Sequence, residues 1–390
     1  MAGTLKLKRG EERRIKAGHL WIYADEVEKL SVQTPGGLVH VSDSRGHGLG
    51  TAYANPASKI VARMLSKKNF SELKSAWWQE RLGQALARRD WAFRTPHYRW
   101  VHGEGDKLPG LIVDRFGDDV VLQAHTAGIE AELETIASAI DALVRPANIY
   151  INNKANSRRY EGLESYSKVW KGSGNGIVTA NEAGIPMQCH ALEGQKTGYF
   201  YDQRPNREWI GRLCKGRRVL DLFAYVGAFA VKALEHEASE VVSLDASEAA
   251  LGWAKRNVGA AGFGDRWQGV QVDIMRALPE MAAKGERFDV VICDPPAFVK
   301  SRNRLKEGLR GYQKLAMEAT RLVKPGGIFC AASCSGLVGS DDFRKATVAG
   351  IREAGRGAQI VYEGGAGADH PWLPAMPETR YLKFLGMFLD

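Results

Sequence analysis

From residue 217 onward, short apolar segments typical of β-strands alternate with longer segments of helical periodicity. Strands that alternate with helices form a mostly parallel sheet with helices on both faces. Ser247 and Glu248 suit the N-cap and first turn of one of these helices. The strand-like segments are RRVLDLFAYV, EVVSLDA, VQVDI, FDVVICD, GGIFCAAS, QIVYEGG and YLKFLGMFLD. The pattern therefore predicts an α/β fold with a seven-stranded, mostly parallel sheet.

Two smaller units precede this sheet. Residues 1–72 read as short strands broken by the turn signals TPGG, DSRGHG and NPAS. They hold 12 lysines and arginines against seven acidic residues, a local net charge of +5. Residues 73–188 begin with an aromatic, basic helical stretch and continue with mixed strands and helices. We therefore predict three domains: 1–72, a central α+β domain at 73–188, and the large sheet at 189–390.

Charge and cysteine usage narrow the class of protein. The net charge of +9 favours a polyanionic partner, although a solvated basic surface would also explain it. No C-x-x-C spacing occurs, which argues against a disulfide framework and against a zinc site. No apolar run has the length of a membrane span, and the N-terminus lacks a signal core. We expect a soluble, cytoplasmic protein without a metal. The five cysteines are Cys189, Cys214, Cys293, Cys330 and Cys334.

Carboxylates at the predicted strand ends indicate a nucleoside site. Asp221 lies in the first strand, Asp245 ends the next strand and can accept hydrogen bonds from both ribose hydroxyls, and Asp273 ends VQVD, where it can meet an adenine amine. Gly227 marks the turn into a helix, where a missing Cβ lets a ligand approach. Few glycines follow, which disfavours a pyrophosphate and favours S-adenosylmethionine. Any single aspartate could instead cap a helix or end a strand. The predicted cofactor residues here are Asp221, Phe223, Gly227, Asp245, Ala246, Asp273 and Asp294.

A second candidate for cofactor binding is the polar and aromatic segment GQKTGYFYDQR, just before the large sheet. Its side chains could close over the methionine and adenosine ends of the cofactor. An interdomain linker held by surface salt bridges is the alternative. The predicted residues are Lys196, Thr197, Tyr199, Asp202, Gln203 and Arg204.

Two motifs at strand ends carry the predicted chemistry. Asp294 is followed by two prolines, which force the chain out of the sheet in a fixed extended shape. Cys334 lies between two serines after GGIFCAA, at an edge where open α/β sheets bind ligands. Its thiol could act as a nucleophile. For the proline loop, the alternative is a stiff loop without a chemical role. For Cys334, the alternative is a buried cysteine that acts as a small apolar residue.

The chain resembles the ribosomal RNA large subunit methyltransferase I family. The resemblance rests on GEGDKLPGLIVDRFG (103–117), GQKTGYFYDQRPNR (194–207), VLDLFAYVGAFA, CDPPAF, SCSG and ADHPWLPAMPETRYLK (368–383). It implies a class I Rossmann-like domain, a central α+β domain and an N-terminal PUA-like β-barrel that binds RNA. It also implies an S-adenosylmethionine-dependent enzyme that forms 5-methylcytosine in 23S rRNA.

The resemblance implies roles for two residues. Cys334 would add to carbon 6 of the cytosine, and Asp294 would bind the ring. A guanine methyltransferase stays an alternative, because DPPAF alone permits it. So does a non-catalytic RNA-binding or assembly protein. The modified nucleotide, the base that removes the carbon 5 proton, a monomeric or homodimeric state, and naked rRNA or an assembly intermediate as substrate all stay open.

Overall fold

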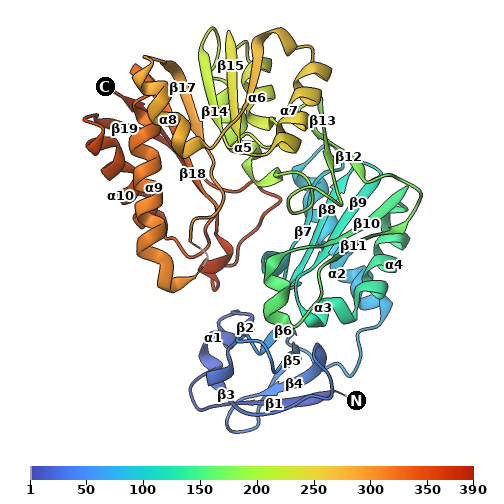
Figure 1. Cartoon of the computed structure of the whole chain (residues 1–390). Coiled ribbons are helices and arrows are strands. Elements are labelled where there is room, and N and C mark those ends of the chain that lie inside the picture. The colour runs from blue at the N-terminus through green and yellow to red at the C-terminus, as the bar shows by residue number, and fades with distance from the viewer. Residues whose placement is uncertain (1, 300) are drawn as a thin grey trace. The chain divides into compact units, whose positions relative to one another are not determined.

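The computed structural model describes residues 2–299 and 301–390, and the chain forms two compact units (Figure 1). The first unit contains the chain up to residue 181 together with 189–201 and 368–379. The second unit contains 182–188, 202–367 and 380–390. The three-domain division at residues 72 and 188 stays a prediction. Among the described residues, no helix is long and apolar enough to cross a membrane.

The N-terminal part of the first unit is a six-stranded sheet in the order β2-β6-β5-β4-β1-β3. β1 pairs in parallel with β4, and the other neighbours are antiparallel. Alternating buried residues such as Leu5 and Leu7, and Val39 and Val41, place one face of each strand in a small apolar core. The elements are β1 Gly3–Leu7, α1 Glu12–Lys16, β2 Trp21–Ile22, β3 Val27–Ser31, β4 Gly37–Ser42, β5 Gly48–Ala54 and β6 Ala62–Ser66.

The first unit also contains a five-stranded sheet in the order β11-β10-β9-β8-β7. Trp78 and Leu82 of α2 and Ile136 and Ile140 of α4 belong to the apolar core that this sheet shares with its helices. The elements are α2 Ser75–Ala92, β7 His97–His102, β8 Leu111–Phe116, β9 Asp119–Ala124, α3 Ala127–Ala131, α4 Leu133–Val144, β10 Asn148–Asn153 and β11 Tyr166–Lys171. This mixture of strands and helices confirms the α+β character predicted for the central region.

Polar contacts join the N-terminal sheet to the rest of the first unit. The hydroxyl of Tyr53 donates a 2.8 Å hydrogen bond to the carbonyl of Pro109. The buried carboxylate of Glu161 accepts hydrogen bonds from Ser58 at 2.7 Å and from Arg63 at 2.9 Å. Tyr53 and Leu65 also belong to the apolar core of the five-stranded sheet, so removal of the N-terminal sheet would open that core and leave Glu161 without these partners.

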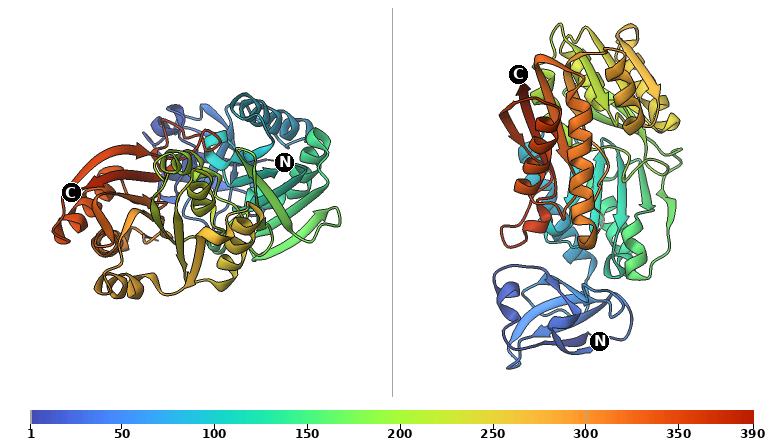
Figure 2. Two further views of the ribbon diagram at one scale, coloured as in Figure 1. Left: turned by 90° about the horizontal axis from the view of Figure 1, so that it is seen from above. Right: turned by 60° about the vertical axis from the view of Figure 1, so that its left-hand side comes forward.

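The second unit is built on a seven-stranded sheet in the order β16-β15-β14-β17-β18-β20-β19. β14 to β18 are parallel, and β20 lies between β18 and β19 and is antiparallel to both. The predicted α/β class and mostly parallel seven-stranded sheet are confirmed. Figure 2 shows the strands and helices of the chain from two further sides. The strands are β14 Arg218–Leu222, β15 Glu240–Asp245, β16 Trp267–Gln271, β17 Phe288–Cys293, β18 Val323–Ser333, β19 Ala358–Gly364 and β20 Lys383–Leu389.

Helices cover both faces of this sheet. α8, α9 and α10 contribute buried residues to one large apolar core, for example Leu278, Leu315 and Phe343. On the other face, the ring of Trp209 in α5 packs over Gly386, where a Cβ would lie 2.3 Å from the ring. The helices are α5 Arg204–Gly211, α6 Ala228–Glu235, α7 Glu248–Ala260, α8 Ile274–Ala283, α9 Leu305–Thr320 and α10 Ser340–Glu353.

Short elements complete the chain. A two-stranded sheet pairs β12 Ile177–Glu182 with β13 Ile185–His190. The 3-10 helices are η1 Ala24–Glu26, η2 Gly103–Asp106, η3 Asn156–Glu161, η4 Tyr201–Gln203, η5 Gly264–Arg266, η6 Arg302–Arg304 and η7 Pro377–Thr379.

The strand order reverses direction between β14 and β17. The chain builds β14, β15 and β16 outward on one side and then returns to add β17 and β18 on the other. Open α/β sheets bind ligands at such a switch point, outside the carboxyl ends of the strands. Three predicted residues, Phe223, Asp294 and Cys334, directly follow the carboxyl ends of β14, β17 and β18.

Candidate active site

The loop that leaves β14 has a strained backbone. Phe223 and Tyr225 have φ angles of 64° and 50°, in the left-handed region that residues with a Cβ rarely adopt. The loop is held by the neighbouring strand, because the N–H groups of Phe223 and Ala224 donate to the carbonyl of Leu244 at 2.9 and 3.2 Å. Strain of this kind gathers at functional sites, where surrounding contacts maintain it.

Gly227 lies at the N-cap of α6 with a φ of 79°, so the predicted turn into a helix is confirmed. The structure gives another reason for the missing side chain than the approach of a ligand. A Cβ at this position would lie 2.9 Å from the Cβ of Ala254 in α7. The glycine therefore permits both the left-handed turn and the close packing of α6 against α7.

Asp245 ends β15, as predicted, and its carboxylate organises two loops. One oxygen accepts a 2.9 Å hydrogen bond from the N–H of Tyr225, and the other accepts a 2.8 Å bond from the N–H of Ser247. Ser247 in turn caps α7 by accepting from the N–H of Ala250, which confirms the predicted helix start. The next residue, Ala246, is exposed beside this carboxylate.

Asp221 is a buried carboxyl group, only 1% exposed, in the middle of the site. Burial, together with the nearby charges of Asp294 and Asp245, raises its pKa to about 8. Hydrogen bonds from Ser243 and from the N–H of Ala230 partly oppose this rise. Within the described part of the chain, its Oδ2 atom has no hydrogen-bond partner. A buried acceptor without a partner is costly, so the site is suited to a ligand that carries a donor or a positive charge.

The prediction that Asp273 ends a strand is wrong. β16 ends at Gln271, so Asp273 does not end a strand. It is the N-cap of α8, and its Oδ1 accepts a 3.1 Å hydrogen bond from the N–H of Arg276. An aspartate is a favoured N-cap because its oxygen satisfies an otherwise unpaired helix N–H. Its predicted contact with adenine stays a prediction.

Asp294 follows β17 and is held from the start of α5. Gln203 donates a 2.9 Å hydrogen bond from Nε2 to Oδ2 of Asp294. The amide oxygen of Gln203 accepts a 2.6 Å bond from Asn206, which fixes the orientation of the amide. Asp202, one residue earlier, accepts a hydrogen bond from the hydroxyl of Tyr381. Arg204 is the first residue of α5.

Cys334 lies between two buried serines that share one partner. The hydroxyl of Tyr312 in α9 lies 2.9 Å from the side-chain oxygens of both Ser333 and Ser335. The two serines are 0% and 1% exposed, whereas Cys334 is half-buried. These shared bonds to the Tyr312 hydroxyl, which we call the Tyr312 clamp, hold the tripeptide in place.

The thiol of Cys334 meets the proline loop. Its Sγ atom lies 4.0 Å from the carbonyl oxygen of Pro295, directly after Asp294. The ring of Phe298 in the same loop packs on Tyr312 with centroids 4.7 Å apart. The two predicted catalytic motifs therefore come together at the ends of the neighbouring strands β17 and β18.

The other four cysteines are buried. Burial raises the pKa of Cys214 to about 12, and it holds the thiols of Cys189, Cys293 and Cys330 well above the usual pKa of a thiol. Cys334 is thus the cysteine with solvent access. Among the residues that the structure describes, no cluster of three or more His, Cys, Asp or Glu could hold a metal ion.

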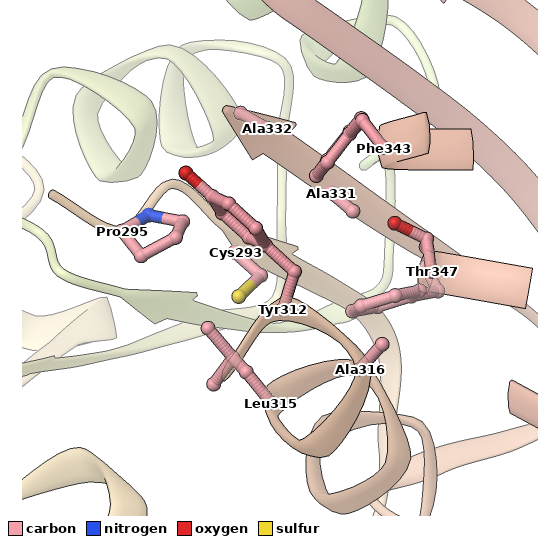
Figure 3. Close-up of a pocket in the computed structure, with 10 residues that line it drawn as sticks. Cys293, Pro295, Tyr312, Leu315, Ala316, Ala331, Ala332, Phe343 and Thr347 are labelled. Atoms are coloured by element: carbon pink, nitrogen blue, oxygen red, sulfur yellow. The ribbon is translucent and has the colours of Figure 1, made fainter. Parts of the chain in front are cut away.

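A small apolar pocket lies between β17, β18, α9 and α10 (Figure 3). Cys293, Pro295 and Tyr312 line it, together with Thr347 and apolar residues of α9, β18 and α10. Its volume of about 10 Å³ is no more than one water molecule requires. It is a packing defect in the core and too small for a nucleobase.

The segment GQKTGYFYDQR is divided between the two units after Tyr201. Lys196, Thr197 and Tyr199 belong to the first unit. There Thr197 is buried and donates to Asp114, and Tyr199 packs edge-to-face on Tyr201. Asp202, Gln203 and Arg204 belong to the second unit. A role in cofactor binding for these six residues stays a prediction.

Sequence reasoning missed two residues beside Cys334. Tyr312 is the clamp, and Lys383 donates a 2.6 Å hydrogen bond to the carbonyl of Ser335. Tyr312 looks like an ordinary apolar position of a helix. Lys383 is the last residue of the motif ADHPWLPAMPETRYLK, and a lysine at the head of a strand otherwise made of apolar residues is a usable signal.

The residues present fit S-adenosylmethionine. The donor set is rich in carboxylates, Oδ2 of Asp221 lacks a partner within the described chain, and the strained loop after β14 carries no run of phosphate-binding glycines. Asp221, Asp245 and the loop from Phe223 to Gly227 would hold the cofactor. Its ammonium and sulfonium groups would compensate the clustered negative charge.

Comparisons with known proteins agree with this chemistry. Two family models match: "PUA-like domain" over residues 5–67 and "S-adenosylmethionine-dependent methyltransferase" over residues 157–357. A protein of Erwinia tasmaniensis named "Ribosomal RNA large subunit methyltransferase I" is 36% identical over 98% of each chain. A protein of the same name from Yersinia pseudotuberculosis is 35% identical over 98% of each chain. Among solved structures, that of "SMU.776, a putative methyltransferase complexed with SAH" is similar in fold, with a TM-score of 0.86 over the whole of both chains at 21% identity.

Proposed function

This chain belongs to the ribosomal RNA large subunit methyltransferase I family of S-adenosylmethionine-dependent enzymes, and we propose that it forms 5-methylcytosine in 23S rRNA. The single observation that supports this best is the meeting of two motifs. The half-buried thiol of Cys334 lies beside the carbonyl of Pro295, in the loop that begins with Asp294. A nucleophile and a carboxylate are thereby available on neighbouring strand ends.

Methylation of cytosine at carbon 5 requires a nucleophile on the enzyme. S-adenosylmethionine supplies an electrophilic methyl group, which a nucleophilic carbon must attack. Carbon 5 of an unmodified cytosine is too weak a nucleophile to do so. Addition of the Cys334 thiolate to carbon 6 pushes the electron pair of the C5=C6 bond to carbon 5. After methylation, loss of the carbon 5 proton restores the double bond and expels the thiolate. The ring takes up a proton from solvent at N3 as the thiolate adds, and we assign to Asp294 the acceptance of a hydrogen bond from this N3–H, which favours the reactive form of the ring.

The proposed substrate is rRNA. The named relatives act on ribosomal RNA, the N-terminal region matches a PUA-like domain, and residues 1–72 carry a net charge of +5. Lysines and arginines that neutralise phosphates supply affinity without regard to sequence. An enzyme of this kind works where ribosomes are assembled, so we propose the cytoplasm as its location.

The Cys334→Ala variant tests the proposal. RNA that carries 5-fluorocytosine at the target should trap wild-type enzyme covalently, because fluorine replaces the proton whose loss releases the thiolate. We expect no adduct and no 5-methylcytosine from the variant, while it still binds S-adenosylmethionine. Mass spectrometry of 23S rRNA fragments from cells with and without the protein identifies the product.

Two results would redirect the proposal. Full activity of Cys334→Ala with a methylated guanine as product would favour the guanine methyltransferase alternative, because amine methylation needs no covalent adduct. Absence of any methyl transfer by the wild-type protein, with RNA binding retained, would favour a non-catalytic RNA-binding or assembly protein.

A further inference from the structure

The amino group of Lys383 lies next to the tripeptide Ser333-Cys334-Ser335. Lys383 is the first residue of β20 and pairs directly with Ser333 of β18. It is only 6% exposed. Nζ donates a 2.6 Å hydrogen bond to the carbonyl of Ser335 and a 2.7 Å bond to the carbonyl of Tyr381. The lysine therefore contacts the residue that immediately follows Cys334.

A buried ammonium group normally has a carboxylate partner. In the described ranges 2–299 and 301–390, no carboxylate lies within ion-pair distance of Lys383, and its two hydrogen-bond partners are neutral carbonyls. Lys232, another buried lysine of the same unit, pairs with Glu208 and Glu235. A buried cation without an anion destabilises the folded protein, so a buried lysine at position 383 needs a reason beyond packing.

Cys334 can provide the missing anion. Burial lowers the pKa of Lys383 to about 8, and a negative charge on Cys334 opposes that decrease. The interaction is mutual, because a charge that favours the ammonium is itself favoured by the ammonium. An ammonium group has three N–H donors, and the two carbonyls account for two of them.

We propose that Lys383 is the positioning residue that holds Cys334 in its thiolate form and so prepares it to attack carbon 6 of the cytosine. The inference rests on the proposed function and adds the source of the nucleophile's activation. The thiol gives up its proton to solvent, and the ammonium of Lys383 remains charged beside the sulfur. The same lysine ties the Ser335 and Tyr381 carbonyls together, which keeps the positive charge at a fixed place.

The ionisation of Cys334 can be measured in the full-length protein without RNA. Iodoacetamide alkylates thiolates, and the other four cysteines are buried. The alkylation rate of the Cys334 peptide is followed by mass spectrometry from about pH 6 to about pH 10. We expect the wild-type midpoint to lie below the ~8.5 of a free thiol. A wild-type midpoint at or above that value overturns the proposal without any variant.

Variants separate a charge effect from a structural brace. We expect Lys383→Gln to raise the midpoint by about one pH unit and to slow alkylation at neutral pH about tenfold. Lys383→Arg keeps the charge and should stay near the wild type. Lys324→Gln is the matched control. Lys324 lies at the start of β18, at the opposite end from Cys334, and pairs with Asp289. A lower melting temperature of Lys383→Gln with an unchanged midpoint would show a brace only and would overturn the proposal.

The outcome is independent of the methylated base. If Cys334→Ala remained active, the covalent mechanism would fail, yet the titration could still show Lys383 acting on the thiol. If the titration were unchanged by Lys383→Gln while 5-fluorocytosine trapped the enzyme, only the role of Lys383 would fail.

Discussion

Gln203 donates a 2.9 Å hydrogen bond to Oδ2 of Asp294, and the orientation of its amide is fixed by Asn206. A hydrogen bond to a charged group contributes ~1.5–3 kcal/mol. We therefore expect Gln203→Leu to lower kcat for methyl transfer about tenfold or more. Gln203→Glu should be worse, because a second carboxylate would face Asp294. Steady-state kinetics test this, with Gln359→Leu as control, because Gln359 is exposed on the edge strand β19. Equal kcat in all four proteins would exclude Gln203 from the site.

Replacement of Asp245 should weaken cofactor binding. Its carboxylate accepts from the N–H groups of Tyr225 and Ser247, so it both shapes the strained loop and, as we propose, binds the ribose. We expect Asp245→Ala to lose at least ~1.5–3 kcal/mol of binding free energy, about ten- to a hundredfold in Kd. Calorimetric titration with S-adenosylmethionine measures it. A variant that melts earlier but binds the cofactor with full affinity would show that Asp245 only anchors the loops.

The free energy of unfolding should depend on pH because of the carboxyl group of Asp221. Its pKa is about 8 in the folded chain, because of burial first and the charges of Asp294 and Asp245 second, against an ordinary 3.8. Between these values the folded state binds a proton that the unfolded state has lost. This contribution to stability is complete at low pH and is lost as the pH rises to about 8, by at most ~1.4 kcal/mol per pH unit.

The measurement is a comparison of melting curves. From about pH 6 to about pH 8 the wild type should lose more stability than Asp221→Asn, whose side chain does not titrate. S-adenosylmethionine should stabilise the wild type more at the upper end of this range, because its positive charge favours the ionised carboxylate. Parallel curves for the two proteins would show that Asp221 does not titrate there.

Much of this fold could be predicted because its signals are local. Alternating strand and helix periodicity fixes the parallel sheet, and the strand ends place Asp245, Asp294 and Cys334 at one edge. The prediction for Asp273 was wrong because the ends of strands are hard to locate from sequence. An aspartate after a strand and an aspartate at a helix N-cap have the same short sequence signature. The cap geometry alone distinguishes them.

The contacts that tune the site could not be predicted, because they join distant parts of the chain. Gln203 is 91 residues from Asp294, and Lys383 is 48 residues from Ser335. No periodicity relates such pairs, and only the insertion of β20 beside β18 brings the lysine to the cysteine. The sequence also does not reveal that the hydroxyl of Tyr312, 21 and 23 residues away, bonds the two serines on either side of Cys334.

The Tyr312 clamp should matter more for catalysis than for folding. Tyr312→Phe keeps the ring that packs on Phe298 and Phe343 and removes the hydroxyl shared by the two serines. We expect a loss of about 1–2 kcal/mol of stability and at least a tenfold lower kcat, with the affinity for S-adenosylmethionine unchanged. Chemical denaturation, kinetics and calorimetry test the three parts. Wild-type kcat in a folded Tyr312→Phe would mean that Cys334 needs no clamp.

The N-terminal sheet should supply salt-dependent RNA affinity. Deleting residues 1–72 would be a poor test, because Tyr53 and Arg63 are built into the first unit. Charge removal keeps the fold, and Arg9, Arg13 and Lys16 are exposed around α1. If these side chains contact phosphates, changing all three to Gln should lower the slope of log affinity against log salt by about 2, and binding should weaken with no change in cofactor affinity.

The matched control removes three charges from the second unit. Lys284, Arg287 and Lys324 lie near the amino ends of β17 and β18, opposite to the strand ends that carry Asp294 and Cys334. Changing these three to Gln should leave the salt slope close to that of the wild type. Filter binding of a 23S rRNA fragment across a range of salt concentrations measures both triple variants. If both lowered the slope equally, the effect would come from net charge alone, and the N-terminal sheet would have no special part in binding RNA.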